Sequence, residues 1–505
     1  MKKVTNVFYF AVILVGIMVA LGAIFPVKFE QISQSVQAWV SSTFGWYYLL
    51  LMSVLVAVAL FIAVSPYGNI RLGKDSDRPD FSNISWVAML FAAGIGIGLV
   101  FYGASEPLAH FMIDAPLSEP GTAQAFKEAL SHSFFHWGIH GWSMYGLVAL
   151  AIAYFQFRKD EPGLISVTLK PLFGDRMNGG FGKAIDALAI FATVVGVATS
   201  LGLGAIQINA GLSHLFDLPV NIGVQATIIL IVTVLFIISA WSGLNKGIKT
   251  LSNINLILAL ILFIFVLAVG PTLLIFNMFS ESIGLYFQNF IQMSFRSAPL
   301  ASDNRAWLDI WTIFYWAWWI SWAPFVGIFV ARISRGRTIR QFIFGVIIVP
   351  VLVISAWFTV FGTTAGDMQQ QGIVDLTQFP TELVLFNMFD YLPLSTIISL
   401  LAIFLLVIFF ITSADSATFV LGMQSTGGSL SPPNSVKVAL GLSISAVALI
   451  LLYVGGLSSL QNTVIVAALP FSFVIILMVI SLYKALKEDA YIKRRKTSLK
   501  KNEEA

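Results

Sequence analysis

The chain has 505 residues, of which 58% are hydrophobic and only 11% are charged, and its mean hydropathy is +0.87. A soluble domain carries about 25% charged residues, so this composition excludes a large soluble domain and indicates a polytopic membrane protein. The absence of cysteine excludes disulfides and thiolate metal sites. The formal net charge is +4, and its distribution along the chain is more informative than its size.

Twelve hydrophobic stretches of the sequence are long enough to cross a bilayer, because each has about 18 residues or more. They cover, roughly, residues 5–25, 45–64, 85–111, 129–157, 182–213, 221–241, 251–275, 307–332, 339–361, 391–422, 434–454 and 461–483. Several exceed about 20 residues, so tilted or broken helices are expected. The first stretch resembles a signal peptide, but it is longer than the usual apolar region of one, and we expect an uncleaved helix. The predicted fold class is an all-α polytopic membrane protein with 12 transmembrane helices.

The positions of the basic residues predict the orientation of these helices. With twelve spans and an inside N-terminus, only Lys28, Lys127, Arg296 and Arg305 fall outside, and the other 25 of the 29 Lys and Arg residues (29 minus these four) fall inside. The positive-inside rule then predicts a multi-pass protein of the cell membrane with both termini in the cytoplasm. The basic tail 485–505 fits this topology, and contact with anionic lipids is the alternative interpretation. The basic balance does not indicate a nucleic-acid partner.

The eighth span carries an unusual run of tryptophans. Six of the thirteen tryptophans fall within the sixteen residues 307–322. Tryptophans usually form belts at the two membrane interfaces, which is what we expect of Trp307 and Trp311. A dense run within a span predicts instead an aromatic cage, and such cages recognise quaternary ammonium ions through cation–π attraction. At about 100° per residue, one arc of the helix holds Trp318, Trp322, Phe325 and Phe329, while Trp316 and Trp319 lie on other sides.

The fourth span supplies a second aromatic set. Trp137, Trp142 and Tyr145 occupy an arc of about 140° on a helix, which is enough for two further walls, although packing is the usual role of aromatic stripes. A caged trimethylammonium group needs no protein carboxylate, and one nearby would repel a zwitterion through the ligand's own carboxylate.

Glycines in the third span predict a place where the ligand's carboxylate could meet backbone donors. Gly94, Gly96 and Gly98 allow the backbone to approach a ligand or to unwind, although close helix packing is the alternative. The third and eighth spans both look irregular, the eighth because of Pro324, and they lie five spans apart. An odd offset reverses the direction of crossing, so spans 3–7 and 8–12 can form inverted repeats with interrupted helices in corresponding places.

Two other groups of polar residues lie within spans. On the tenth span, Thr412 and Ser413 could join backbone carbonyls as oxygen ligands for Na⁺, or bond back onto their own helix, and Asp415 suggests a gate or water contact near the inner end. On the fourth span, His132, His136 and His140 are spaced at i, i+4 and i+8. Hydrogen-bonded structural histidines are the main interpretation, with a metal site or a proton path as the alternatives. No nucleophile motif, phosphate loop or nucleotide signature appears, so an enzyme is not expected.

These residues together resemble the betaine/carnitine/choline transporter family. The resemblance lies in the run from Gly94 to Pro107, in His-Trp-Gly-Ile-His-Gly-Trp at 136–142 and in the run from Phe314 to Arg337, and it covers essentially the whole chain. It implies a homotrimer of twelve-span protomers with a leucine-transporter-like five-plus-five inverted repeat. It also implies a tryptophan box. The substrate-binding candidates are Trp137, Trp142, Tyr145, Trp316, Trp318, Trp319, Trp322, Gly94, Gly96 and Gly98.

The resemblance to sodium-coupled members implies one Na⁺ site and part of a second. Backbone oxygens at Ala92, Ile95 and Phe409 would join the hydroxyls of Thr412 and Ser413. The second site would use Thr193 and Phe325, but Val197 stands where the family has another threonine. Proton-coupled choline carriers of the family place Asp at the last glycine of the span 3 motif, where this chain has Gly98. The implied function is therefore sodium symport of glycine betaine, with Na⁺ as coupling ion and no cofactor.

The alternatives within the fold are a proton-driven choline carrier and a sodium-independent carnitine or betaine antiporter; a channel and a membrane enzyme are alternatives of other classes. The predicted organisation has five parts. They are two N-terminal helices (1–84), a first five-helix repeat (85–275), an outer interfacial helix and loop (276–306, with an amphipathic helix at 280–296), a second five-helix repeat (307–484) and a basic cytoplasmic tail (485–505).

Overall fold

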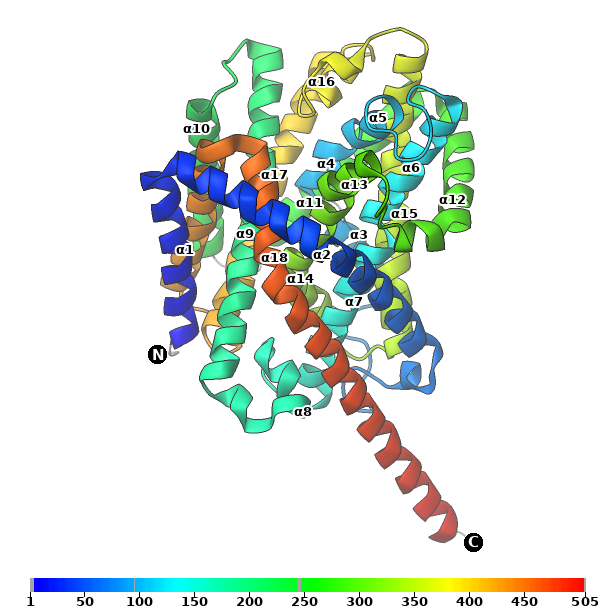
Figure 1. The fold of residues 1–505 in the computed structure, drawn as a ribbon. Coiled ribbons are helices and arrows are strands. Elements are labelled where there is room, and N and C mark those ends of the chain that lie inside the picture. Colours follow the sequence, from blue (N-terminus) through cyan, green and yellow to red (C-terminus); the bar gives the residue numbers. More distant parts are fainter. Residues whose placement is uncertain (1–3, 95, 243–246, 504–505) are drawn as a thin grey trace.

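The computed structural model describes residues 4–94, 96–242 and 247–503, and within these ranges it contains helices and no strand apart from an isolated bridge between Arg71 and Thr338. The α-helices are α1 (Asn6–Ile24), α2 (Pro26–Val64), α3 (Asn83–Gly94), α4 (Ile97–Tyr102), α5 (Ser105–Met112), α6 (Ala123–Trp137), α7 (Ile139–Ala153), α8 (Lys170–Phe173), α9 (Gly180–Phe216), α10 (Ile222–Ser242), α11 (Gly247–Val269), α12 (Thr272–Phe295), α13 (Ser302–Trp307), α14 (Ile313–Arg332), α15 (Ile339–Gln370), α16 (Val384–Phe389), α17 (Ser395–Ser425) and α18 (Asn434–Glu503). Short 3-10 and π-helical segments are η1 (Pro66–Asn69), η2 (Tyr154–Arg158), η3 (Ser166–Leu169), η4 (Gly174–Asn178), η5 (Leu308–Thr312) and η6 (Leu376–Gln378). The prediction of an all-α membrane protein is confirmed (Figure 1).

Ten helical segments of the described chain are long and apolar enough to cross a membrane. The predicted stretch 85–111 is missing from these ten because it is divided among α3, α4 and α5. The predicted stretches 434–454 and 461–483 both lie in α18, which is not helical at Gly455 and Gly456. Gly456 has φ 60° and ψ −136°, a backbone conformation that glycine adopts without strain. In Figure 1 the chain turns at the top of the bundle in this region before it descends to the C-terminus. Twelve crossings stay a prediction.

The interruption of the third span is confirmed. Helix α3 ends at Gly94 and α4 begins at Ile97, with Gly96 extended between them (φ −162°, ψ −175°). Ile95 lies outside the described residues.

The expected interruption of the eighth span is wrong. Helix α14 continues through Pro324, because a proline removes only one intrahelical hydrogen bond and packed neighbours can compensate within a membrane bundle. The irregular part is the π-helical turn η5, which precedes α14. The fourth span is broken instead, at Gly138 between α6 and α7 (φ −101°, ψ −127°). A Cβ at this position would lie 2.2 Å from the carbonyl oxygen of Phe134, so the break requires glycine.

Three predicted boundaries also differ from the structure. The seventh span was expected to reach residue 275, but α11 ends at Val269 because Gly270 and Pro271 terminate it. The amphipathic helix was expected at 280–296, whereas α12 begins directly after this Gly-Pro pair. The second span was expected at 45–64, and α2 already begins at Pro26.

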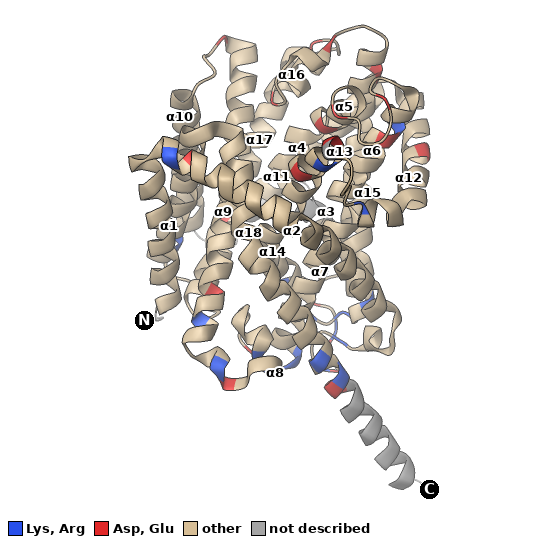
Figure 2. Cartoon of the chain, viewed as in Figure 1, with Lys and Arg blue, Asp and Glu red and all other residues tan. Residues whose placement is uncertain are grey.

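Charged residues separate toward the two ends of the bundle. Figure 2 shows most of the drawn Lys and Arg residues at the lower end, around α8, whereas acidic residues gather at the upper end around α5, α6 and α16. Helix α1 begins and helix α18 ends toward this lower end of the bundle (Figure 1). Between these ends, α14 packs against α7, α9 and α18, so the tryptophan run lies in the middle of the bundle.

Candidate functional site

A central cavity of about 200 Å³ lies between α4, α7, α9, α11, α14 and α17, with Trp137 of α6 on its wall. No charged side chain belongs to its lining among the residues that the structure describes. One part of the lining is aromatic and the other carries hydroxyl and amide groups. The aromatic residues are Trp137, Trp142, Tyr145, Trp318, Trp319, Trp322, Phe325, Phe329 and Phe409. The polar ones are Ser200, Ser252, Asn255, Thr412, Ser413 and Ser416.

Five aromatic residues form the cage that we define as Trp137, Trp142, Tyr145, Trp318 and Trp319. The Trp137 ring lies perpendicular to Trp319, with centroids 5.3 Å apart at 88°, and nearly perpendicular to Trp318 at 5.8 Å and 79°. Tyr145 stands edge-on to Trp319 at 5.4 Å, and Trp142 edge-on to Tyr145 at 5.5 Å. Rings that meet at right angles expose their faces in several directions, which is the arrangement that surrounds a cation.

The indole N–H groups of this region are anchored to buried acceptors. Trp319 Nε1 donates to the carbonyl oxygen of His136 at 2.8 Å. Trp322 Nε1 donates to the carbonyl oxygen of Gly196, also at 2.8 Å. Trp137 Nε1 donates to the Oε2 atom of Glu106 at 2.8 Å. These bonds fix the ring planes, because an indole has a single donor and rotates only if that bond breaks.

Other donors on the lining residues are unused. Within the described part of the chain, the buried atoms Trp142 Nε1, Trp318 Nε1, Tyr145 Oη and Ser200 Oγ have no hydrogen-bond partner. Buried polar groups without partners carry a cost. These four groups belong to lining residues, but the atoms themselves are buried and not exposed to the open cavity.

Gly98 is the glycine that the cage requires. A Cβ on this residue would lie 2.6 Å from Cη2 of Trp318 and 2.7 Å from Cη2 of Trp137. The edges of these two rings therefore converge where Gly98 leaves space. At Gly96 a Cβ would meet nothing within 4 Å, so this glycine is not needed for packing.

Most of the polar lining groups come from α11 and α17, and we call these residues the polar end: Ser252, Asn255, Thr412, Ser413 and Ser416. Thr412 Oγ1 donates to the carbonyl oxygen of Ile408 at 2.9 Å and accepts from Asn255 Nδ2 at 2.9 Å. Thr412 also lies 3.2 Å from the carbonyl oxygen of Phe409. The structure thus places Phe409, Thr412 and Ser413 at one cavity, as the predicted Na⁺ site requires, but the Thr412 hydroxyl is bonded back to its own helix.

Some predicted site residues lie elsewhere. Trp316 is not part of the lining and stacks on His140 instead, at 5.3 Å and 24°. Thr193 is buried in α9 with its hydroxyl bonded to the carbonyl oxygen of Ala189 at 2.8 Å, and it is not a lining residue of the cavity, whereas Phe325 is. Gly94 ends α3. Ala92 lies within α3, and Ile95 falls outside the described residues.

Trp307 and Trp311 do not behave as the expected interface anchors. Trp307 is buried and packs on the imidazoles of His110 and His136, with centroids 5.1 and 5.4 Å away. Trp311 contacts His110 at 4.6 Å. The π-helical turn η5 directly follows Trp307 and contains Trp311, and the two rings cover a cluster of histidines.

Each histidine of the predicted ladder has its own partner, as the structural interpretation predicts. His132 Nδ1 is 2.9 Å from the carbonyl oxygen of Glu128, and His140 Nε2 is 3.0 Å from Ser294 Oγ. His136 Nδ1 is 2.7 Å from Oε1 of Glu106.

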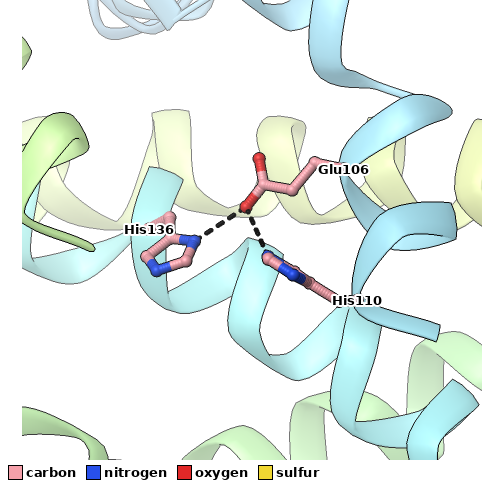
Figure 3. A group of neighbouring side chains, drawn as sticks. All are labelled: Glu106, His110 and His136. Carbon is pink, nitrogen blue, oxygen red and sulfur yellow. Dashed lines mark hydrogen bonds and ion pairs between the residues drawn. The ribbon is translucent and has the colours of Figure 1, made fainter. Parts of the chain in front are cut away.

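Glu106 joins His136 and His110 in a buried group of three (Figure 3). Its Oε1 atom lies 2.7 Å from His136 Nδ1 and 3.3 Å from His110 Nε2. Two ligands of a tetrahedral ion, each about 2.1 Å from it, would be about 3.4 Å apart. The 2.7 Å separation is a hydrogen-bond distance, so the group is arranged as a hydrogen-bonded network and not as a metal site.

A family profile described as BCCT, betaine/carnitine/choline family transporter, matches residues 6–491. The chain belongs to this family of membrane transporters. The cavity lies inside the matched region, as do all residues of the cage and of the polar end.

Individual relatives cover nearly the whole transporter. The glycine betaine transporter OpuD of Bacillus subtilis is 56% identical over 489 residues, which is 97% of this chain and 96% of that protein. An ectoine/hydroxyectoine transporter of Virgibacillus pantothenticus is 42% identical over 486 residues, covering 95% and 96% of the two chains. An osmo-dependent choline transporter of Acinetobacter baylyi is 39% identical over 492 residues, covering 96% of this chain and 71% of the other.

Three residues of this transporter's site escaped the reasoning from sequence. Glu106 stands within the third-span motif but had no assigned role, and neither Tyr315 nor Asn255 was singled out. Glu106 is separated by 31 positions from Trp137 and by 209 from Tyr315, so no local pattern joins them. A signal was present nonetheless, since a carboxylate within an apolar span is costly unless it has partners.

Proposed function

We propose that this transporter imports glycine betaine, or a closely similar methylated zwitterion, together with Na⁺. The observation that supports this most is the cage itself: five rings around a cavity with no charged residue among its described lining residues. A trimethylammonium group binds such a cage by cation–π attraction, at about 0.5–2 kcal/mol for each well-placed ring.

The rest of the cavity suits the other end of a zwitterion. A carboxylate needs donors, and the unpartnered N–H and O–H groups of the lining residues could supply them once these buried side chains turn toward the cavity. The backbone near Gly96 and Gly98 can also approach a ligand closely, because α4 begins beside the cavity. A bare cation such as choline would leave these donors unused. The relative named as a glycine betaine transporter supports this choice.

Sodium would bind at the polar end. The proposed ligands are the hydroxyls of Thr412 and Ser413 with backbone oxygens of Phe409, Ala92 and Ile95, and a second ion would use Thr193 and Phe325. Each Na⁺ that enters at 100 mV supplies about 2.3 kcal/mol. Two ions would therefore support a gradient of roughly 10³, at about 1.4 kcal/mol per tenfold.

The proposed setting is the cell membrane, with twelve crossings and both termini in the cytoplasm, as the basic end of the bundle suggests. The basic tail would contact anionic lipids there. The protomers would form a homotrimer, and rocking of the two inverted five-helix repeats (85–275 and 307–484) would alternate access to the cavity.

Uptake into proteoliposomes tests the proposal. Labelled glycine betaine should accumulate when an inward Na⁺ gradient is imposed, and accumulation should cease when Na⁺ is equal on both sides and no voltage is present. Uptake that ignores Na⁺ would contradict sodium symport and favour the antiporter. Uptake of choline driven by a proton gradient would favour the choline carrier. Flux that only equilibrates, without accumulation, would identify a channel.

A further inference from the structure

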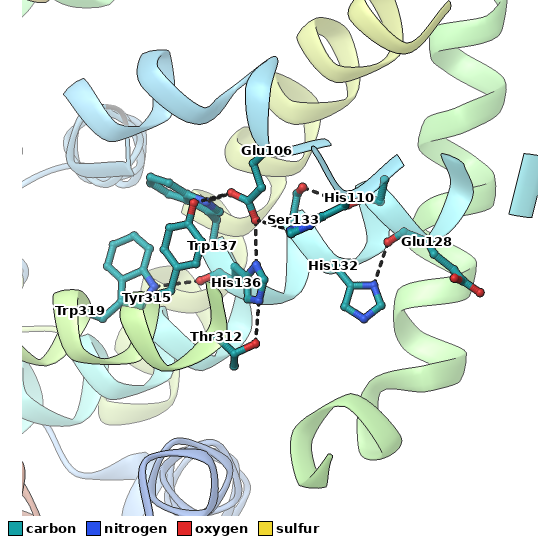
Figure 4. A network of polar contacts seen from close by, with 11 residues as sticks. Glu106, His110, Glu128, His132, Ser133, His136, Trp137, Thr312, Tyr315 and Trp319 are labelled. Atoms are coloured by element: carbon teal, nitrogen blue, oxygen red, sulfur yellow. Dashed lines mark hydrogen bonds and ion pairs between the residues drawn. The ribbon is translucent and has the colours of Figure 1, made fainter. Parts of the chain in front are cut away.

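A buried carboxylate lies directly behind one wall of the cage. Glu106, on α5, is fully buried and does not line the cavity. Its Oε2 atom accepts hydrogen bonds from Trp137 Nε1 at 2.8 Å and from Tyr315 Oη at 2.6 Å (Figure 4). Trp137 does line the cavity, so only one ring separates a carboxylate from the place of the ligand.

The hydrogen bonds around this carboxylate are those of an ionised group. Its Oε2 atom accepts from two donors, the indole N–H of Trp137, which can only donate, and the hydroxyl of Tyr315. At Oε1, the Nδ1–H of a neutral His136 donates at 2.7 Å, and its Nε2 then accepts a hydrogen bond from the Thr312 hydroxyl at 3.0 Å. This assignment satisfies a neutral His136 and gives the carboxylate donors on both oxygens. An ionised carboxylate is strongly stabilised in such an arrangement.

The same network reaches a second wall of the cage. His136 bonds Glu106 with its side chain and accepts Trp319 Nε1 with its carbonyl oxygen at 2.8 Å. Trp137 and Trp319 are therefore both hydrogen-bonded to the connected pair Glu106 and His136, although the two tryptophans come from α6 and α14 (Figure 4). These are the two rings that stand perpendicular at 5.3 Å.

Resting on the proposed function, we infer that Glu106 is a positioning residue that also supplies the counter-charge of the cage. Its negative charge makes the cage select a ligand with a positively charged head over one with a neutral head of the same shape. Two effects would favour the positively charged head. The charge attracts a cation across the ring in a medium of low dielectric constant. A hydrogen bond from the indole N–H to an anion also polarises the ring and strengthens its attraction for cations. The ligand's carboxylate lies at the far end, where Glu106 repels it less.

The test uses a pair of ligands that differ only in charge at the head. Glycine betaine carries a trimethylammonium group, and 3,3-dimethylbutanoate carries a tert-butyl group of the same shape on the same CH₂–carboxylate. Isothermal titration calorimetry of the purified full-length transporter, at saturating NaCl, gives both dissociation constants and hence a charge-selectivity ratio for each variant.

Glu106→Gln removes the charge and keeps the shape, and its amide can still accept from Trp137 and Tyr315 and donate to His136 in the other tautomer. We expect the affinity for glycine betaine to fall about tenfold, equivalent to about 1.4 kcal/mol. The affinity for 3,3-dimethylbutanoate should stay within twofold, so the ratio falls about tenfold. A residue with a purely structural role would lower both affinities together and leave the ratio unchanged, and that result would overturn the inference.

Two further variants keep the inference testable. Glu106→Asp retains the charge but shortens the reach to Trp137, so both affinities should fall while the ratio stays within threefold of wild type. A ratio that falls about tenfold would contradict the role of charge, and this test applies even if Glu106→Gln does not fold.

Glu128→Gln is the matched control. Glu128 is also a buried carboxylate, accepting from Ser118 Oγ at 2.9 Å and Gln124 Nε2 at 3.0 Å, but it bonds no ring of the cage. Its ratio should equal that of wild type.

The wild-type protein separates this inference from the proposed function. If wild type binds neither ligand, or binds glycine betaine without any effect of Na⁺ on its affinity, the proposed function fails. If wild type binds glycine betaine and Glu106→Gln has the same ratio, only the inference about Glu106 fails.

Discussion

The aromatic and polar ends of the central cavity differ in how far their groups are arranged before any ligand arrives. At the aromatic end, Trp137 and Trp319 are each fixed by a hydrogen bond of 2.8 Å to a buried acceptor. At the polar end, the hydroxyl of Thr412 is already bonded to Ile408 and Asn255. A cation can enter the cage without breaking these anchors, whereas an ion at Thr412 must share the hydroxyl oxygen with the Asn255 N–H or displace it, because a hydroxyl has only two lone pairs. Pre-arranged groups bind at lower cost, so the substrate head should depend on rigid walls and the ion on an exchange of hydrogen bonds.

The largest expected effect is the loss of a wall. Trp319→Leu removes the ring that meets both Trp137 and Tyr145. A desolvated cation–π contact is worth about 2 kcal/mol, so the affinity for glycine betaine should fall about thirtyfold at about 1.4 kcal/mol per tenfold. Isothermal titration calorimetry measures this, and size-exclusion chromatography checks that the protein stays folded. Trp241→Leu, an exposed tryptophan on α10, is the control and should leave affinity unchanged. Equal affinity in Trp319→Leu and wild type would count against the cage.

A smaller effect is expected where the walls are kept but displaced. Gly98→Ala places a methyl group within 2.7 Å of two ring edges, so Trp318 and Trp137 must both move. We expect roughly a tenfold loss of affinity, about 1.4 kcal/mol, with little change in the sodium dependence of uptake. Gly146→Ala on α7 is the matched control, because its Cβ would meet only Val346, at an ordinary 3.6 Å. If Gly98→Ala binds glycine betaine with wild-type affinity, the rings of Trp318 and Trp137 are not fixed in place.

The polar end should respond in the opposite way. Thr412→Ala removes a proposed Na⁺ ligand, so the Na⁺ concentration for half-maximal uptake should rise about fivefold, about 1 kcal/mol, while affinity for glycine betaine at saturating Na⁺ stays within twofold. Sodium titrations of uptake in proteoliposomes measure both quantities. Thr418→Ala is the control, since this threonine of the same helix is bonded to the carbonyl oxygen of Asp415 at 2.8 Å and does not line the cavity. An unchanged sodium dependence in Thr412→Ala would place the ion elsewhere.

The elements that could be predicted from sequence are those with a local cause. Long apolar runs predict spans, and the closely spaced glycines at 94–98 predicted the break between α3 and α4. Pro324 was taken as a break because its local effect is to remove a hydrogen bond, but the helix continues because the rest of α14 is packed on three helices. The break between α6 and α7 occurs at Gly138, where the backbone is not helical, and a single glycine within a span is not enough to predict such a break.

The aromatic residues of the site could be predicted from the sequence, but the hydrogen-bond acceptors that hold their rings could not. The period of a helix put Trp318, Trp322, Phe325 and Phe329 on one arc, and the structure places all four at the cavity. The acceptors behind the rings come from distant segments, and helical spacing carries no information about them. The sequence argument held that a carboxylate near the cage would repel a zwitterion. Our inference about Glu106 adds a condition to that expectation, because a carboxylate behind a ring would face the proposed position of the ligand's head and not that of its carboxylate.

The smallest expected effect concerns a histidine that belongs to neither end. His140 Nε2 donates to Ser294 Oγ at 3.0 Å, because that hydroxyl donates onward to the carbonyl oxygen of Phe290 at 2.6 Å. A glutamine amide can make the same bond. His140→Gln should therefore keep glycine betaine uptake within twofold of wild type.

Replacing His136 should have a larger effect than replacing His140. His136→Gln alters the group that bonds Glu106 and, through its carbonyl oxygen, Trp319, so it should lower affinity several-fold although the two histidines are only one helical turn apart in sequence. A chelator should leave the wild-type rate unchanged, since the 2.7 Å contact in the Glu106 group is a hydrogen bond. Equal losses in His140→Gln and His136→Gln would mean that the histidines act through packing alone. A loss of uptake on chelation would show that the network holds a metal after all.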